Sequence, residues 1–94
     1  MALKPEHSAN EKLAAQLHEA DTLIDRLTSL YNQWFAGIEK RAPIEVRARL
    51  EAMMQQISGA VKLTPSTKFK YQGLQSKFQT YRDRWDKLIK KKGG

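Results

Sequence analysis

Three side chains near the start of the sequence have the types and the spacing that could hold a metal ion. His18, Asp21 and Asp25 are separated by three and then four residues, which places them on one side of an α-helix. Imidazole and carboxylate groups are common metal ligands, and a site needs several of them to converge. Polar residues at this spacing are equally common on exposed helix faces, so we predict no metal site here.

No other set of residues has the pattern of a catalytic or cofactor-binding site. A nucleophile would need a histidine beside it, whereas His7 and His18 both belong to the N-terminal region. The sequence has no cysteine, no glycine-rich phosphate loop and no paired Glu-x-x-His motifs. We therefore predict a protein that is not an enzyme, uses no cofactor or metal and takes no small-molecule substrate.

Basic side chains form a more distinctive pattern late in the sequence. One row recurs at intervals of seven residues and consists of Lys70, Lys77, Arg84 and Lys91. If this region is a helix parallel to the first, the opposing flank offers only one carboxylate, Asp21, so most of the row would lack a partner within the molecule. Such a row could bind phosphates, an acidic partner helix or anionic lipid headgroups.

The net charge of +7 is distributed unevenly along the 94 residues. Residues 1–39 contain three basic and six acidic side chains, a balance of −3, whereas residues 40–94 contain fourteen and four, a balance of +10. This asymmetry predicts a dipolar molecule with one anion-seeking end. Excess lysine also promotes solubility, so the charge alone does not identify a partner.

The elements that must position these residues are three amphipathic helices, predicted at residues 9–40, 43–59 and 65–91. Apolar residues in the first are spaced alternately by four and three, as in a coiled-coil seam: Leu13, Leu17, Ala20, Ile24, Leu27, Tyr31, Trp34 and Ile38. Ser8 or Asn10 is the expected cap of the first helix, and Thr64 that of the third. Pro43 is expected to end the first helix, and Pro65 to open the third.

Short connections make consecutive helices antiparallel neighbours, so we predict an all-α, up-down-up three-helix bundle. A single domain covers residues 9–91, between a flexible N-terminus at 1–8 and a disordered tail at 92–94. The third helix should begin beside residues 18–22, which would bring Trp85 close to Trp34 and Ile38. The predicted aromatic core layer comprises Tyr31, Trp34, Phe35, Phe78, Tyr81 and Trp85. Whether Gly73 interrupts the third helix is left open.

The predicted register leaves the first turns of the first helix, with Leu13 and Leu17, beyond the ends of the other two. Such an overhang frays, is covered by the N-terminal residues, or pairs with another molecule. The outermost row of the helix contains only small, uncharged residues, Ala15 and Thr22 among them. We therefore predict a contact with a partner helix, or with a second copy of the chain, through Leu13, Leu17, Ala15 and Thr22.

Two stretches, "FAGIEKRAP" and "KFKYQGLQSKFQTYRDRWDKL", resemble a small helical domain of unknown function found in some proteobacteria. The shared pattern covers about residues 31–90 and joins an aromatic helix end, a Glu-Lys-Arg-Ala-Pro run and a basic-aromatic helix. The resemblance implies an interaction module and brings no activity, cofactor or binding residue.

Two functions are consistent with the sequence. The first is a non-enzymatic protein–protein interaction or scaffold module that self-associates or docks a partner helix. The second is a nucleic-acid or anionic-surface binder that uses the row on the third helix. We expect a cytoplasmic protein, because no apolar run approaches the roughly 20 residues of a membrane span and "MALKPEHSANEK" lacks the apolar block of a signal peptide.

Overall fold

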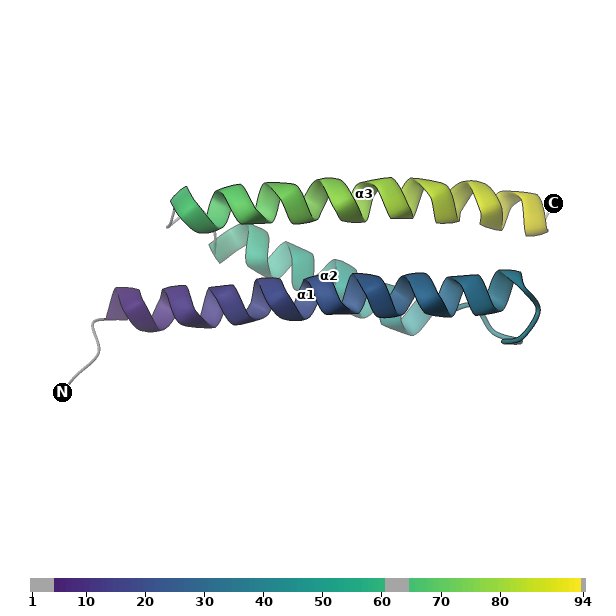
Figure 1. The fold of residues 1–94 in the computed structure, drawn as a ribbon, viewed down its shortest axis with the longest axis horizontal. Coiled ribbons are helices and arrows are strands. Elements are labelled where there is room, and N and C mark those ends of the chain that lie inside the picture. The colour runs from purple at the N-terminus through teal and green to yellow at the C-terminus, as the bar shows by residue number, and fades with distance from the viewer. Residues whose placement is uncertain (1–4, 61–64, 94) are drawn as a thin grey trace.

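The computed structural model describes residues 5–60 and 65–93, which form three helices: α1 (Pro5–Phe35), α2 (Ile44–Ala60) and α3 (Pro65–Gly93). No strand occurs within these two ranges. α1 and α3 run side by side in the same direction, and α2 runs in the opposite direction, behind them in the view of Figure 1. The molecule measures 56 × 22 × 15 Å. The predicted all-α, up-down-up three-helix bundle is confirmed.

α1 is the central helix of the bundle. It packs along both other helices, whereas α2 and α3 contact each other much less. The buried seam of α1 supplies one side of the core, and α2 and α3 each turn an apolar stripe toward it. The buried core residues are Leu13, Leu17, Ala20, Ile24, Leu27, Tyr31, Leu50, Met54, Ile57, Tyr71, Leu74, Phe78 and Trp85.

The helix ends differ from the prediction at several points. α1 begins at Pro5, because proline suits the first helical position, where no amide donor is needed. The predicted flexible segment 1–8 is therefore helical from residue 5, and Ser8 and Asn10 lie inside the helix instead of capping it. Residues 1–4 and the predicted cap Thr64 lie outside the described ranges. α3 continues through Gly73 and reaches Gly93, so residues 92 and 93 of the predicted tail are helical and Gly94 lies outside the described ranges.

α1 ends at Phe35, about five residues earlier than predicted, because Gly37 rather than Pro43 stops it. Gly37 adopts a φ of 81°, a left-handed conformation that suits glycine. Its amide donates to the Trp34 carbonyl at 3.1 Å, and the Ile38 amide donates to the Gln33 carbonyl at 2.9 Å. These two hydrogen bonds define a Schellman motif, which satisfies the last carbonyls of the helix. No described part of the chain approaches Gly37 closely: nothing lies within 4 Å of the position that a Cβ would occupy.

Gly37→Ala is expected to lower the free energy of unfolding by about 1–2 kcal/mol, because alanine pays a steric cost in the left-handed region. Gly59→Ala is the matched control. Gly59 lies within α2 and has open space around it, so alanine there should stabilise the domain by roughly 0.5–1 kcal/mol. Thermal unfolding followed by circular dichroism measures both. Two shifts of the same sign would contradict this account of the α1 terminus.

The register of α3 against α1 also differs from the prediction. Lys77 of α3 pairs with Asp21 and Asp25 of α1, so the start of α3, twelve residues before Lys77, does not lie beside residues 18–22 as predicted. Trp85 stacks on Tyr31, with ring centroids 4.6 Å apart, instead of lying against Trp34 and Ile38. Ile38 is 74% exposed and does not belong to the core cluster. Because α1 stops at Phe35, the helical turn that would have placed Ile38 against Trp85 does not exist. α3 therefore sits closer to the N-terminal end of α1.

This displacement covers the leucines that were expected to overhang. Leu13 is only 5% exposed and Leu17 only 7%. Both belong to the same core cluster as Leu74 of α3. The expectation that these leucines remain uncovered is wrong, because α3 extends over them. Ala15 and Thr22 are exposed, as their row predicted.

The aromatic layer lies at the end of the bundle where α1 stops. Tyr31, Phe78 and Trp85 are buried, and Trp34, Phe35 and Tyr81 are partly buried against the core. The rings stack or tilt on one another at centroid distances between 4.6 and 6.4 Å. Such pairs add specific geometry to the burial of large apolar surfaces.

Candidate anion-binding surface

The excess positive charge of the protein resides on α3. This helix contains nine basic and two acidic side chains, a balance of +7. The rest of the chain contains eight basic and eight acidic side chains, so it contributes no net charge. α3 also turns its apolar stripe inward, against α1. Its polar sides are therefore the exposed ones, and they hold most of the cations.

The structure divides the predicted row into one neutralised and three exposed cations. Lys70, Arg84 and Lys91 are exposed, and none of them forms an ion pair with another described residue. Lys77 is part-buried and pairs with Asp21 of α1, the one carboxylate that the opposing flank was expected to offer. The row that faces solvent thus consists of Lys70, Arg84 and Lys91, with Lys87 and Lys90 exposed beside its C-terminal end.

Lys77 bridges two carboxylates of α1. Its Nζ donates to Asp21 Oδ1 at 2.7 Å and to Asp25 Oδ1 at 3.1 Å. The hydrogen bond to Asp21 is the main cause that raises the pKa of Lys77, and burial opposes it. The ammonium therefore stays charged across the neutral range. Only Asp21 was expected on this flank of α1; Asp25 lies one helical turn further along and binds the same lysine.

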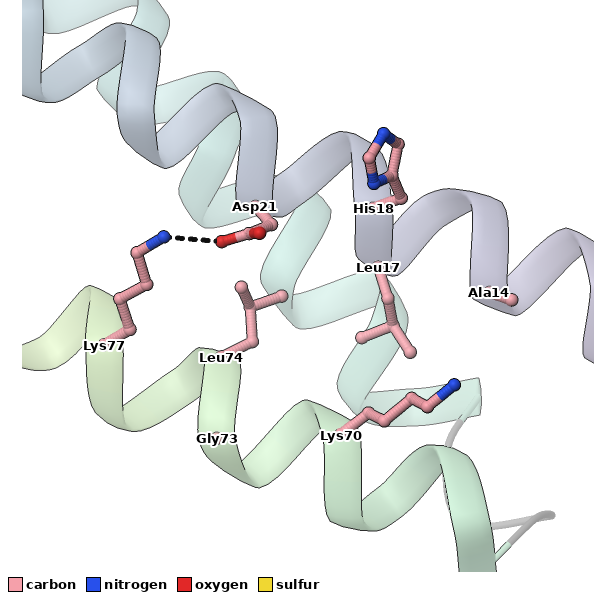
Figure 2. A pocket seen from close by; sticks show the side chains of 8 residues that line it. All are labelled: Ala14, Leu17, His18, Asp21, Lys70, Gly73, Leu74 and Lys77. Carbon is pink, nitrogen blue, oxygen red and sulfur yellow. Dashed lines mark hydrogen bonds and ion pairs between the residues drawn. The ribbon is translucent and has the colours of Figure 1, made fainter.

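These contacts also bear on the metal site considered at the outset. Asp21 and Asp25 are both engaged by Lys77. The His18 side chain is exposed and does not point toward Asp21 (Figure 2). Across the described residues, no group of three or more histidine, cysteine or carboxylate side chains is arranged to hold a metal. The ion pairs explain why two carboxylates share this helix face.

A second internal ion cluster joins all three helices. Arg47 of α2 lies 2.8 Å from Asp86 of α3 and 3.0 Å from Glu51, and it donates to the hydroxyl of Tyr31 at 3.1 Å. The hydrogen bond to Asp86 is the main cause that raises the pKa of Arg47, against the opposing effect of burial. Because Asp86 pairs with Arg47, one of the two acidic residues of α3 is engaged in an internal contact.

Two further cations of α3 lie over aromatic rings. Arg82 is 5.8 Å from the centroid of Phe78, and Lys92 is 5.1 Å from the centroid of Trp34. Such cation–π contacts hold a long side chain against the bundle. Lys92 therefore shields the partly buried Trp34 at the end of α1. These two residues take part in packing and are not assigned to the binding surface.

An open groove of about 500 Å³ runs between α1 and α3, near the N-terminal end of the row (Figure 2). Leucines form its apolar floor, and small residues on the two helices keep it open. Charged side chains lie along it, including the Lys77–Asp21 pair. The lining residues are Ala14, Leu17, His18, Asp21, Lys70, Gly73, Leu74 and Lys77.

Phe69 is the exposed residue that sequence analysis missed. Its side chain is 78% exposed, between the exposed side chains of Lys68 and Lys70. A signal was present in the sequence, because Phe69 lies off the seam formed by Tyr71, Leu74 and Phe78. The departure of one ring from the helical period of its neighbours therefore indicated an outward-facing aromatic side chain.

No family model, curated protein or solved structure matches the chain. The surface itself is therefore the guide to function. Among the described residues, no helix has both the length and the apolar character needed to cross a membrane.

Proposed function

We propose that the protein is a non-enzymatic interaction module that binds nucleic acid along the exposed basic row of α3. The observation that carries the proposal is the location of the charge. α3 holds an excess of seven cations, and the rest of the chain is balanced. A polyanion that contacts several of these side chains releases its condensed counterions, which favours binding.

The shape of the row suits a linear polyanion. Lys70 and Lys91, the two ends of the row, are 21 positions apart on one continuous helix, which corresponds to roughly 31 Å at about 1.5 Å per residue. Lys87 and Lys90 add positive charge at the C-terminal end of the row. A phosphate backbone carries repeated charges over such a length, whereas a single small anion would meet only one of these side chains.

The exposed side of α3 lacks the apolar stripe that other anionic partners require. An acidic partner helix docks through apolar residues at intervals of three and four, and a helix lying on a membrane inserts a continuous apolar face. The apolar stripe of α3 is buried against α1. Among its large apolar residues, only Phe69 and Leu88 are exposed. Charge without an apolar stripe favours a nucleic-acid backbone over a helix or a lipid surface.

The alternative function, self-association or helix docking through α1, would need exposed apolar side chains on α1. Leu13 and Leu17 are buried within one chain, so they are not offered to a partner. Ala15 and Thr22 remain exposed, but Thr22 donates its hydroxyl to the His18 carbonyl at 3.0 Å and these two small residues supply little apolar area. We therefore assign the interaction to α3.

The test is the salt dependence of binding to a fluorescent oligonucleotide duplex. The triple variant Lys70→Gln, Arg84→Gln and Lys91→Gln removes three exposed cations and leaves the Lys77 ion pairs intact. If each contacts a phosphate, the slope of log affinity against log salt should become shallower by about 3, since each contact contributes about 0.9. Fluorescence anisotropy between low and moderate salt measures the slope.

The matched control removes the same charge from other surfaces. Lys12→Gln, Arg26→Gln and Arg49→Gln change exposed cations of α1 and α2, so the net charge falls equally without touching the row. We expect this variant to keep most of the slope. If both variants lost the same part of the slope, net charge alone would explain binding, and the role of the row would be refuted. Failure of the unaltered protein to bind duplex at low salt would also refute the proposal.

A further inference from the structure

Among the residues that the structure describes, Phe69 is the only aromatic side chain outside the core cluster and the residues packed against it. The other seven rings of the chain all belong to the core cluster or lie against it. Phe69 projects from the first turns of α3 and is 78% exposed, between two exposed lysines. Nothing in the packing of the described residues requires an aromatic ring at this position.

Gly73 keeps the surface beside Phe69 open. It lies one helical turn further along α3, and a glycine inside a helix is destabilising relative to alanine. Within the described residues, no packing reason offsets that cost: the backbone conformation is helical, and nothing lies within 4 Å of the position that a Cβ would occupy. Side chains on a helix lean toward its N-terminus, so any residue at 73 would lean toward Phe69 and into the groove.

The groove between α1 and α3 opens beside this glycine (Figure 2). Its floor is formed by Leu17 and Leu74, and Lys70 lines it close to the position of Phe69 in the chain. Its volume of about 500 Å³ lies in the range of small-ligand sites. An apolar floor with a cation beside it suits a planar base attached to a phosphate.

We propose that this end of α3 is a binding site for single-stranded nucleic acid. Phe69 stacks on one base, Lys68 and Lys70 contact the adjoining phosphates, and the groove beside Gly73 receives the neighbouring base. This inference rests on the proposed function and narrows it from nucleic acid in general to unpaired strands. Paired bases in a duplex do not expose their faces to a side chain, whereas every unpaired base offers one for stacking.

The experiment compares the affinities of a single-stranded oligonucleotide and the corresponding duplex for three variants at residue 69. Stacking on one aromatic side chain contributes enough to weaken single-strand binding by about 5- to 150-fold when it is lost. Phe69→Ala and Phe69→Leu should both show this loss, and Phe69→Trp should retain binding. The duplex affinity should change little. Since Phe69 is exposed, none of these changes disturbs the core.

A second variant separates binding from stability. Gly73→Leu fills the groove and covers Phe69, yet it places a strong helix former inside α3, so the melting temperature should rise while single-strand binding falls. Gln79→Leu, at another exposed position of α3, is the control and should leave binding unchanged. Reduced binding in both leucine variants would overturn the role of the groove.

The outcomes distinguish this inference from the proposal on which it rests. Equal effects of Phe69→Ala on both forms of nucleic acid, or no effect on either, would overturn the stacking site and leave the basic row in place. If the unaltered protein bound neither form at low salt, both would fail.

Discussion

Trp85→Ala is expected to remove about 3–5 kcal/mol of folding free energy. A domain of this size is stable by only roughly 5–15 kcal/mol, so the variant should be close to unfolding at body temperature. Trp85 is 2% exposed and lies at the centre of the aromatic layer. Its ring stacks on Tyr31 at 4.6 Å and on Tyr81 at 5.8 Å. Alanine would leave a large cavity at the point where α1 and α3 meet.

Urea unfolding followed by circular dichroism measures this loss, and Trp34→Ala provides a control with the same chemical change. Trp34 is only partly buried and lies at the edge of the layer, beneath Lys92. Its removal should therefore cost much less. If the two variants proved equally stable, the aromatic layer would not be centred on Trp85, and the observed register of α3 would be in doubt.

Leu17→Asp is expected to unfold the protein at every protein concentration. Leu17 is 7% exposed and lies in the core beside Leu74. A carboxylate buried at this position loses its hydration, and the apolar packing of the leucine is lost as well. Together these losses cost more than about 4 kcal/mol of folding free energy in typical cores. Leu17→Ala should give a smaller loss of about 2–5 kcal/mol.

The same substitution would act differently if Leu17 were a contact with a second copy of the chain. Leu17→Asp would then yield a folded monomer, with unchanged helix content and a lower mass in solution. Circular dichroism combined with light scattering distinguishes the two outcomes. Ala15→Asp is the control, because Ala15 is exposed on the same helix and a carboxylate there should leave the fold intact.

The candidate site was partly predictable from sequence. The interval of seven residues identified the basic row, because equal spacing on one helix requires no knowledge of its neighbours. Whether a cation in the row is free depends on the helix opposite. Lys77 is neutralised by Asp21 and Asp25, and Asp86 forms an ion pair with Arg47. These pairs join residues far apart in the chain, so no local pattern indicated them.

The sequence by itself determined the three helices, their order and their buried faces, since periodic apolar residues and the prolines at helix starts act locally. Only the tertiary structure decided where α3 lies along α1. A heptad pattern repeats, so a slip of one turn still sets apolar residues against apolar residues at nearly the same energy. The register is fixed by features that do not repeat along the helices. These are the end of α1 near Gly37, the stack of Trp85 on Tyr31, and the ion pairs of Lys77 with two aspartates. That choice covers the leucines and leaves the cations of α3 as the surface available for binding.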